Sequence, residues 1–452
     1  MKVLIIGTGY VGLNTGVILA YIGHEVTCLD VNQEKIALLQ SGRAPMYEPH
    51  LDTMLGLAAD NLHFISNYDE ADIPHTDVVF IAVGTPSLPD GSANLEYVAQ
   101  AAQSVGSRLD SHFTVVVNKS TVPIGSGNWV GSLMRTAYQG KYGQKPEENY
   151  AIVSNPEFLR QGSALFDTLY PDRIVIGSEN KHALNTLTDL YRPLLNQDFT
   201  APECLPRPEG FSAVPLLTCD LASAEMIKYA ANAFLALKIS YINEVSHLAA
   251  KVGADITQIA RGIGLDERIG PRFLAPGIGW GGSCFGKDTA ALVSTAQEYN
   301  LEMPIVQAAR DVNYKQRTWV VETLQGALKI LKGRRVAMLG FSFKPNTDDL
   351  RDAPSLDIAR MLLQRGATVS AHDPVALPNA RRLYPDLGVR YCDDVYDALE
   401  DADAVVLVTE WPEYRELDWT KLRRVPVVDG RNFLNAKALS DLGFKVIGVG
   451  RG

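Results

Sequence analysis

Short, almost continuously apolar segments recur in two blocks of this 452-residue sequence, and a long helical pattern separates the blocks. Apolar runs without polar alternation are typical of strands that are covered on both faces, as in the parallel sheets of α/β proteins. Amphipathic stretches alternate with these runs over the first 200 residues, which predicts a parallel sheet wrapped by helices. The predicted strands of the first block span 2–7, 25–30, 77–84, 114–120, 151–156 and 173–178.

A second block of the same kind begins near residue 334. In each block one strand ends in glycine and a later strand ends in aspartate, at Gly7 and Asp30 and again at Gly340 and Asp373. The second copy lacks a glycine-rich turn, so it predicts the shape of a nucleotide domain without dinucleotide chemistry. The predicted strands of this block span 334–340, 367–374, 403–410, 425–431 and 445–450.

Between the blocks, residues 220–253 show helical periodicity with no proline and no internal glycine. The pattern is apolar around most of the helix circumference, so we expect this helix to be buried on several sides. More helix is predicted as far as about residue 330, interrupted by a cysteine-containing segment. The proline-rich stretch 201–215 marks the first junction between domains.

These patterns predict an α/β fold in which a central helical domain with one long helix joins two Rossmann-like, doubly wound domains. A chain of this length is too long for a single hydrophobic core, which agrees with several domains. The expected domains are 1–205, 206–325 and 326–452.

Composition narrows the class of partner. The net charge of −10 argues against nucleic acid and against an anionic membrane surface. The five cysteines are an odd number, widely spaced and without a CxxC pair, so neither a disulfide framework nor a zinc or other metal site is expected. No segment after the glycine-broken N-terminal run has about 18 uninterrupted apolar residues. We therefore predict a cytoplasmic protein that does not span a membrane.

The segment GTGYVG at residues 7–12 fits the G-x-G-x-x-G pattern after a strand and at the start of a helix. Gly7 and Gly9 permit a tight turn and close approach of a pyrophosphate, and Gly12 lets the helix pack closely on the strand. Asp30 follows at the end of the next strand, where a carboxylate accepts from a ribose 2′-hydroxyl and repels a 2′-phosphate. The pattern predicts NAD in preference to NADP.

Three further loops, 83–87, 119–123 and 155–162, leave the carboxyl ends of later strands, where ligands bind in open α/β sheets. Hydroxyls on Thr85, Ser120 and Thr121 either face a ligand or satisfy the local backbone. The sequence alone leaves both interpretations open.

One cysteine stands in an unusual setting, GWGGSCFGKD at residues 279–288. A helix is predicted to begin near Gly286, with Ser283 or Cys284 near its N-terminal cap. The helix dipole and Lys287 would then favour the thiolate of Cys284, while Asp288 would orient a group or accept a proton. The alternative is an inert, buried cysteine, which fits Cys28 and Cys392 better.

An activated cysteine beside NAD suggests two successive oxidations at one carbon. Hydride removal from an alcohol leaves an aldehyde, which a thiolate captures as a thiohemiacetal. A second hydride removal leaves a thioester, and water then releases an acid.

The ordered motifs of this chain resemble those of the UDP-glucose/GDP-mannose dehydrogenase family along nearly its full length. The matching segments are GTGYVGL, VGTP, STVP, NPEFLRQG, EMIKYAANAFLALKISYINE, RIGPRFLAPGIGWGGSCFGKD, GFSFKPNTDDLR and VVDGR. The resemblance implies oxidation of UDP-glucose to UDP-glucuronate with two NAD per sugar, by a homodimer built on the long central helix. Another nucleotide sugar, such as GDP-mannose or a UDP-N-acetylhexosamine, is the alternative within the family.

The resemblance also assigns roles to matching positions. Cys284 would be the nucleophile, Lys228 and Asn232 would stabilise the oxyanion, and Thr121, Glu157 and Asp288 would assist proton transfer. Arg268 would reach the site of a neighbouring subunit. The implied cofactor-binding residues are Gly7, Gly9, Tyr10, Val11, Gly12, Asp30, Lys35, Thr85, Thr121, Glu157, Lys287 and Arg351. The implied substrate-binding residues are Phe158, Leu159, Arg160, Lys228, Asn232, Arg268, Phe273, Gly281, Lys344 and Arg431.

Two positions depart from the family pattern. Gln161 stands where glutamate is frequent, and a glutamine cannot act as a base for the hydrolytic water. Gly286 stands where proline is common, which would loosen the start of the helix behind the cysteine.

Two other classes compete with this interpretation. A one-step hydroxy-acid dehydrogenase shares the layout but needs no nucleophilic thiol. A non-catalytic NAD-binding sensor would not need Lys228, Asn232, Glu157 and Cys284 together.

Overall fold

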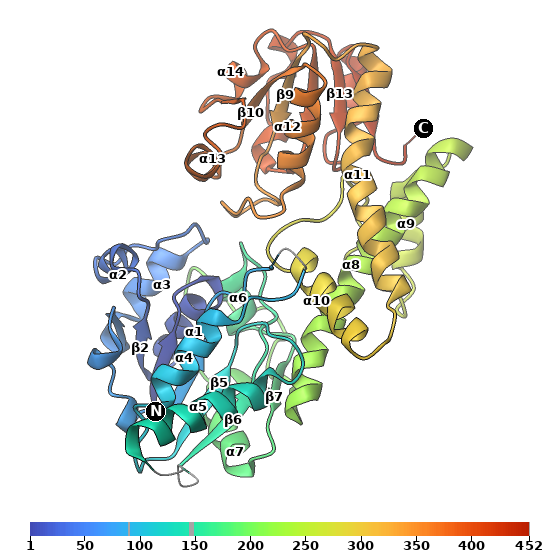
Figure 1. The fold of residues 1–452 in the computed structure, drawn as a ribbon. Coiled ribbons are helices and arrows are strands. Elements are labelled where there is room, and N and C mark those ends of the chain that lie inside the picture. Colours follow the sequence, from blue (N-terminus) through green and yellow to red (C-terminus); the bar gives the residue numbers. More distant parts are fainter. Residues whose placement is uncertain (89–90, 144–148, 452) are drawn as a thin grey trace. The chain divides into compact units, whose positions relative to one another are not determined.

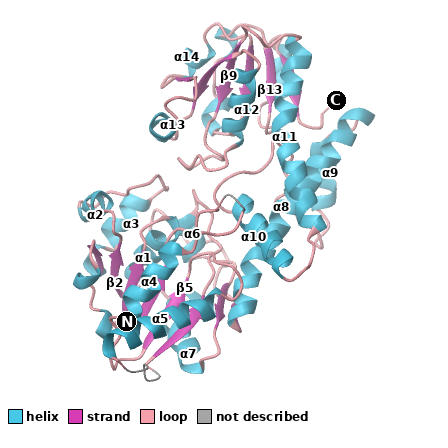
Figure 2. Ribbon diagram, in the orientation of Figure 1, coloured by secondary structure: helices cyan, strands magenta, loops and turns pink. Residues whose placement is uncertain are grey.

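The computed structural model describes residues 1–88, 91–143 and 149–451. The chain divides into two compact units, residues 1–230 and 231–452, and each unit contains one sheet. Figure 1 traces the chain through these elements, and Figure 2 separates helices from strands. The point of division lies within α8 (Leu221–Val252), a single helix of 32 residues that confirms the predicted long helix.

The first sheet has eight strands in the order β3-β2-β1-β4-β5-β6-β7-β8 within the described residues. Its strands are β1 (Lys2–Ile6), β2 (Glu25–Leu29), β3 (Leu62–Ile65), β4 (Val78–Ile81), β5 (Thr114–Asn118), β6 (Tyr150–Ser154), β7 (Ile174–Gly177) and β8 (Leu216–Cys219). The six predicted strands are confirmed to within a few residues. The two that the sequence missed, β3 and β8, are the edge strands, which are only partly covered and therefore lack a continuous apolar run.

One expectation for this sheet was wrong. Strand β7 pairs antiparallel with β6, so β7 and its parallel neighbour β8 run against the other strands and the sheet is mixed. Strand β8 also lies beyond the expected domain boundary at residue 205, so the first sheet continues to Cys219.

Alternating residues of the central strands pack on opposite layers of helices. Val3 and Ile5 of β1 belong to one core cluster, and Leu4 and Ile6 belong to another. This arrangement confirms that the sheet is covered on both faces. The helices of this unit before α8 are α1 (Tyr10–Tyr21), α2 (Gln33–Gln40), α3 (Leu51–Leu57), α4 (Glu96–Gly106), α5 (Ser126–Tyr142), α6 (Ala164–Leu169) and α7 (Lys181–Leu195).

In the described part of the second unit, the sheet has six strands in the order β11-β10-β9-β12-β13-β14, and the paired strands are parallel. Its strands are β9 (Arg335–Leu339), β10 (Thr368–His372), β11 (Val389–Tyr391), β12 (Ala404–Leu407), β13 (Pro426–Asp429) and β14 (Lys445–Gly448). Its helices after α8 are α9 (Ile256–Gly264), α10 (Phe285–Glu298), α11 (Pro304–Leu328), α12 (Pro354–Gln364), α13 (Leu377–Leu383), α14 (Val395–Leu399) and α15 (Ala436–Asp441). Among the described strands of this unit, the sequence missed the short edge strand β11.

Helix α8 is less covered than its sequence pattern predicts. Phe234, Tyr241 and Leu248, spaced seven residues apart, expose 62%, 53% and 65% of their surface. The expectation of burial on several sides is therefore wrong for a single chain. No helix of the described residues, α8 included, is long and apolar enough to cross a membrane.

The strand-end aspartate of the second sheet accepts hydrogen bonds from groups within the fold itself. Asp373 is buried, and its Oδ2 accepts from the backbone N–H groups of Phe341 and Ser342, the Ser342 hydroxyl and the Trp411 indole. Its Oδ1 accepts from two further backbone N–H groups. Both carboxylate oxygens are thus engaged, which explains how this sheet keeps the shape of a nucleotide domain without offering a ribose acceptor.

Replacing Asp373 with alanine should lower the free energy of unfolding by about 3 kcal/mol or more, because it leaves several buried donors unpaired. The matched control is Asp393→Ala, at an exposed carboxylate paired with Arg381, which should cost about 0.5 kcal/mol or less. Urea unfolding of the two variants measures the difference. Equal stability losses would show that the Asp373 network does not hold this sheet together.

Candidate active site

The glycines at the end of β1 form a close-packed turn. Gly7 has φ +99°, in the left-handed region, and a Cβ on Gly12 would lie 1.9 Å from the Gly7 carbonyl oxygen. Gly9 caps α1, and a Cβ there would have open space within 4 Å. The turn therefore packs tightly on the sheet side and leaves room above the helix N-terminus, as a bound pyrophosphate requires.

Asp30 lies beside this turn and is held as a carboxylate. Its Oδ2 accepts from the Thr8 N–H at 3.0 Å, the Thr8 hydroxyl at 2.7 Å and Lys35 Nζ at 2.8 Å. Burial works to raise the pKa of Asp30, but the hydrogen bonds from Lys35 and Thr8 outweigh it and hold the pKa below its ordinary value. The predicted ribose acceptor is thus ionised and oriented. Sequence reasoning missed Thr8, whose hydroxyl in the first variable position of the glycine motif was the available signal.

The hydroxyls on the neighbouring loops serve the backbone. The Thr85 hydroxyl donates to the Thr121 carbonyl at 2.9 Å, and the Ser120 hydroxyl donates to the Val83 carbonyl at 2.7 Å. These bonds tie the loop after β4 to the loop after β5. The structure therefore favours the backbone interpretation for Thr85 and Ser120. Around the glycine turn, the hydroxyl of Tyr10 donates to Tyr47, and Val11 packs against the core.

A buried ion pair lies at the carboxyl end of β6. Lys228 Nζ lies 2.8 Å from Glu157 Oε1, and the side chains expose only 4% and 5% of their surface. The other Glu157 oxygen accepts from the Leu159 N–H at 2.9 Å. The Phe158 ring lies beneath two cations, with Lys228 Nζ 5.5 Å and the Arg173 guanidinium 3.6 Å from its centroid. The loop NPEFLRQG and α8 are thus fastened together by charge.

A second buried lysine, missed from the sequence, belongs to the same region. Lys119 Nζ donates to Asn155 Oδ1 at 3.0 Å, and the Tyr191 hydroxyl donates to the same oxygen at 2.6 Å. Burial lowers the pKa of Lys119 to about 8; Glu157 acts against this shift and Lys228 adds to it. Two ammonium groups therefore act on one carboxylate, an excess of positive charge suited to an anionic or oxyanionic group. The sequence signal for Lys119 was its position directly after β5, in the segment NKST.

Arg160 and Gln161 complete this loop. Arg160 makes a two-pronged ion pair with Asp167 and is half-exposed, while Gln161 is buried. The Glu48 carboxylate accepts from the N–H groups of Gly162 and Ala164 and fixes the turn that follows. The predicted substrate loop is therefore rigidly framed within the first unit.

In the second unit, Cys284 occupies the N-cap position of α10 and is half-buried. The predicted placement of the thiol at a helix N-terminus is confirmed, with the helix beginning at Phe285. Asp288, one turn into α10, is fully buried. Its Oδ2 accepts from Asn232 Nδ2 at 2.6 Å, and its Oδ1 lies 2.9 Å from Lys287 Nζ. The structure thus brings together four predicted site residues, Asn232, Cys284, Lys287 and Asp288.

Other predicted residues surround the segment before Cys284. Arg431 Nη1 donates to the Gly279 carbonyl at 3.0 Å, and the Phe273 ring lies 6.2 Å from that of Phe285. Gly281 has no room for a side chain, because a Cβ would lie 2.2 Å from the Asp352 carbonyl oxygen. Two further predicted residues, both cationic, lie in the loop that follows β9. Arg351 pairs with Asp349, and Lys344 lies over the Phe343 ring.

Arg268 stands apart from these groups. Its side chain is 88% exposed and pairs with Asp266. The same segment is joined to α8, because Lys238 Nζ donates to the Ile269 carbonyl at 2.9 Å. Arg268 therefore lies in the turn after α9, in a segment that is hydrogen-bonded to α8.

All three parts of the chain match one protein family. Residues 1–195 match the NAD binding domain of the UDP-glucose/GDP-mannose dehydrogenase family, 222–315 its central domain and 337–436 its UDP binding domain. The chain belongs to this family. Its N-terminal part is therefore an NAD-binding domain, as the glycine turn and Asp30 indicate, and its C-terminal part is a UDP-binding domain.

Individual relatives agree over the whole length. The UDP-glucose 6-dehydrogenase TuaD of Bacillus subtilis is 42% identical, covering 100% of this chain and 93% of that protein. The solved UDP-glucose dehydrogenase of Pyrobaculum islandicum superposes with a TM-score of 0.87 at 39% identity, covering 100% and 97% of the two chains. A UDP-D-ManNAc dehydrogenase of Pyrococcus horikoshii has a TM-score of 0.84 at 26% identity, with full coverage of both.

Lys119 predicts a pH dependence of stability. Its folded pKa of about 8 lies below the ordinary lysine value, so between the two values the unfolded chain binds more protons and stability rises with pH. Below pH 8 the penalty is fully present. Lys119→Met should therefore raise the free energy of unfolding by about 2 kcal/mol at pH 7 and by little at pH 10, after allowance for the lost hydrogen bond to Asn155.

Urea unfolding at the two pH values tests this, with Lys181→Met, at an exposed lysine, as the control that should show no such pH dependence. A Lys119→Met variant that is less stable than the wild type at both pH values would contradict it.

Proposed function

We propose that this chain oxidises C6 of UDP-glucose to the carboxylate of UDP-glucuronate, with two NAD per sugar and a covalent intermediate on Cys284. The observation that carries the proposal is the half-buried thiol at the N-terminus of α10, with the buried Asp288 one turn behind it. The full-length similarity to TuaD and the UDP binding domain support the choice of sugar nucleotide.

NAD, when bound, supplies the hydride acceptor for both oxidations. In the first, C6 loses a hydride and its hydroxyl loses a proton, which leaves an aldehyde. The Cys284 thiolate then forms a C–S bond with the aldehyde carbon as the C=O π bond opens, and the oxygen takes up a proton to give a thiohemiacetal. Loss of a second hydride and a proton gives a thioester, and water breaks the C–S bond to release the acid and the thiol.

The other residues follow from their surroundings. The Lys228 ammonium and the Asn232 amide are donors, and α8 carries them four residues apart, so they would stabilise the oxyanion at C6. Glu157 and Asp288 are the carboxylates assigned to proton transfer, with Thr121 assisting. Since Gln161 cannot be a base, activation of the hydrolytic water falls to these two carboxylates. The nucleotide sugar would be held by Arg268, Lys344 and Arg431.

A cytoplasmic location stays a prediction from cysteine usage.

The decisive test counts NADH formed from limiting UDP-glucose in excess NAD. The wild type should form two NADH per sugar, whereas Cys284→Ser should lose sustained turnover by about 1,000-fold or more. Cys204→Ser, at another half-buried free cysteine, is the control and should turn over normally.

One NADH per sugar with a free aldehyde from the wild type would rule out the covalent mechanism. No NADH with UDP-glucose but turnover of a UDP-N-acetylhexosamine or of GDP-mannose would move the assignment within the family. Failure with all of these would favour the NAD-binding sensor.

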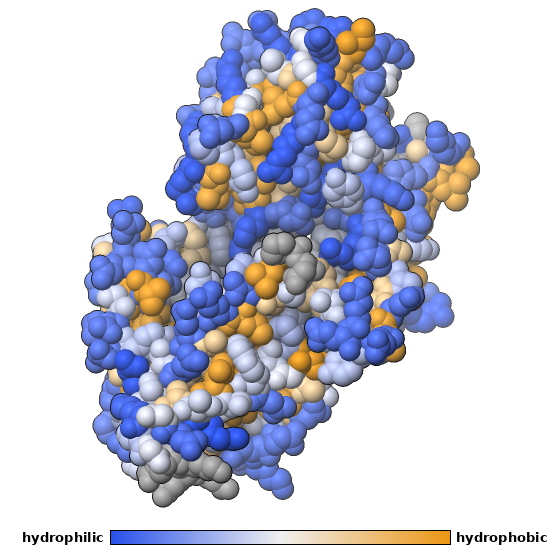
Figure 3. Space-filling model, in the orientation of Figure 1, coloured by the Kyte–Doolittle hydropathy of each residue, from blue (hydrophilic) through white to orange (hydrophobic). Residues whose placement is uncertain are grey.

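We also propose that two copies of the chain pair along α8. The stripe of Phe234, Tyr241 and Leu248 is exposed in one chain, and Val252 and Leu265 extend it. Figure 3 shows hydrophobic surface in orange near the helix labelled α9 in Figure 1. An exposed apolar area of this kind marks an interaction site. Arg268, which projects beside it, would enter the partner's site.

Light scattering after size exclusion should report twice the 49.3 kDa chain mass for the wild type. Tyr241→Asp combined with Leu248→Asp should shift it to the mass of one chain, because two charges in the centre of an apolar interface remain unpaired. Leu383→Asp, at an exposed leucine of α13, should leave the mass unchanged. A wild type that elutes as a single chain would exclude the pairing.

A further inference from the structure

Helix α11 has a buried polar face, which is unusual in a helix interior. Asn313, Gln316 and Arg317 are buried on the same side as Val320 and Leu324. Buried polar side chains require hydrogen-bond partners. Each of the three makes at least one hydrogen bond to a backbone group within residues 277–286, which surround Cys284 and which we call the cysteine segment.

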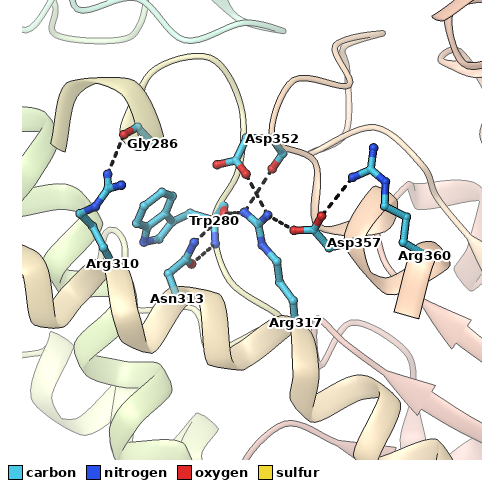
Figure 4. Close-up of polar contacts among 8 residues, drawn as sticks. All are labelled: Trp280, Gly286, Arg310, Asn313, Arg317, Asp352, Asp357 and Arg360. Atoms are coloured by element: carbon cyan, nitrogen blue, oxygen red, sulfur yellow. Dashed lines mark hydrogen bonds and ion pairs between the residues drawn. The ribbon is translucent and has the colours of Figure 1, made fainter. Parts of the chain in front are cut away.

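The bonds from α11 hold the cysteine segment on both sides of the thiol. Asn313 makes two hydrogen bonds to the backbone of Trp280: it accepts from the N–H at 2.7 Å and donates to the carbonyl at 3.0 Å. Gln316 donates to the Gly277 carbonyl at 2.8 Å, and Arg310 donates to the Gly286 carbonyl at 2.8 Å. Figure 4 shows Arg310, Asn313 and Arg317 along one side of α11, reaching toward this segment.

Arg317 connects the cysteine segment to a second structure. Its Nη2 donates to the Trp280 carbonyl at 3.0 Å and to the Asp352 carbonyl at 3.3 Å. Its Nη1 lies 2.8 Å from Asp352 Oδ1 and 2.5 Å from Asp357 Oδ2. A guanidinium has the planar donor array for this, whereas an ammonium is a single point charge. Figure 4 shows Asp352 and Asp357 converging on Arg317.

Asp352 belongs to residues 341–353, the loop that follows β9 and carries Lys344 and Arg351. This loop packs directly on the cysteine segment. The Gly282 N–H donates to the Arg351 carbonyl at 2.9 Å, and a Cβ on Gly282 would lie 2.7 Å from the Phe343 ring. Asp352 has φ +49°, a left-handed conformation that is uncommon outside glycine and that surrounding contacts must hold in place.

A contact at Gly286 completes the arrangement. A Cβ on Gly286 would lie 2.9 Å from Asp352 Oδ2. The glycine at this departure from the family pattern therefore leaves space for the carboxylate that pairs with Arg317.

We propose that Arg317 is a positioning residue for Cys284, because it fastens the cysteine segment and the loop 341–353 to one face of α11. The proposal rests on the proposed function of Cys284 and deepens it. The placement of the thiol then depends on the same guanidinium that fixes the loop carrying Lys344 and Arg351.

The test compares Arg317→Lys with Arg360→Lys as the matched control. Arg360 also pairs with Asp357, at 3.2 Å, but is half-exposed and donates to a different carboxylate oxygen. In the folded, ligand-free chain, iodoacetamide labelling of each cysteine is followed by peptide mass spectrometry. Arg317→Lys should speed alkylation of Cys284 about fivefold or more as the segment loosens, while the buried Cys28 and Cys392 stay protected.

The same variant should lower kcat for UDP-glucose by about 10- to 100-fold with little change in KM, because a displaced nucleophile slows chemistry more than binding. Arg360→Lys should match the wild type in both assays. If Arg317→Lys does not fold, Asp352→Gly replaces it, since glycine tolerates the positive φ and lacks the carboxylate.

A folded variant with wild-type alkylation of Cys284 and wild-type kcat overturns the proposal and leaves Arg317 a structural residue. Alkylation that rises equally at all the cysteines reports general unfolding and also overturns it. The labelling assay needs no substrate, so it decides the role of Arg317 even if the wild type fails to oxidise UDP-glucose.

Discussion

A buried charge must be paired, and the pairing of Glu157 with Lys228 sets the position of much else in this chain. Glu157 leaves the carboxyl end of β6, and Lys228 lies two turns into α8, so their contact fixes the start of the long helix against the first sheet. Because α8 is continuous, Asn232 follows one turn later at a determined rotation. Within the second unit, the Asn232 amide donates to the buried Asp288 carboxylate.

In the second unit, side chains on one face of a helix position the cysteine segment. A loop rich in glycine has little conformational order of its own, and the cysteine segment gains its order from side chains that bind its backbone. Asn313 and Arg317 of α11 and Arg431 after β13 supply those bonds. The glycines are required because neighbouring groups approach within the space that a Cβ would fill. The conformation of this segment is therefore fixed by residues outside it.

Much of the fold was predictable because central strands and long helices leave regular apolar patterns. The edge strands β3, β8 and β11 were missed because partial exposure removes that pattern, and the reversed direction of β7 has no local signature. The burial of α8 was overestimated, since a sequence records that a surface is apolar but not whether the same chain covers it. The positions of Cys284 and Asp30 followed from motifs. Lys119 and Arg317 did not, because their importance arises from partners distant in sequence.

The saturation of Asp373 limits what the second sheet can become. A designer who wished to give it a dinucleotide site could insert a glycine-rich turn after β9 and still have no ribose acceptor, because six donors already occupy the strand-end carboxylate. Freeing that carboxylate would require new partners for a tryptophan indole, a serine hydroxyl and four backbone N–H groups at the same time. The two sheets of this chain therefore share an architecture but are not interchangeable. In the second sheet, the strand-end aspartate that could bind a ligand stabilises the fold instead.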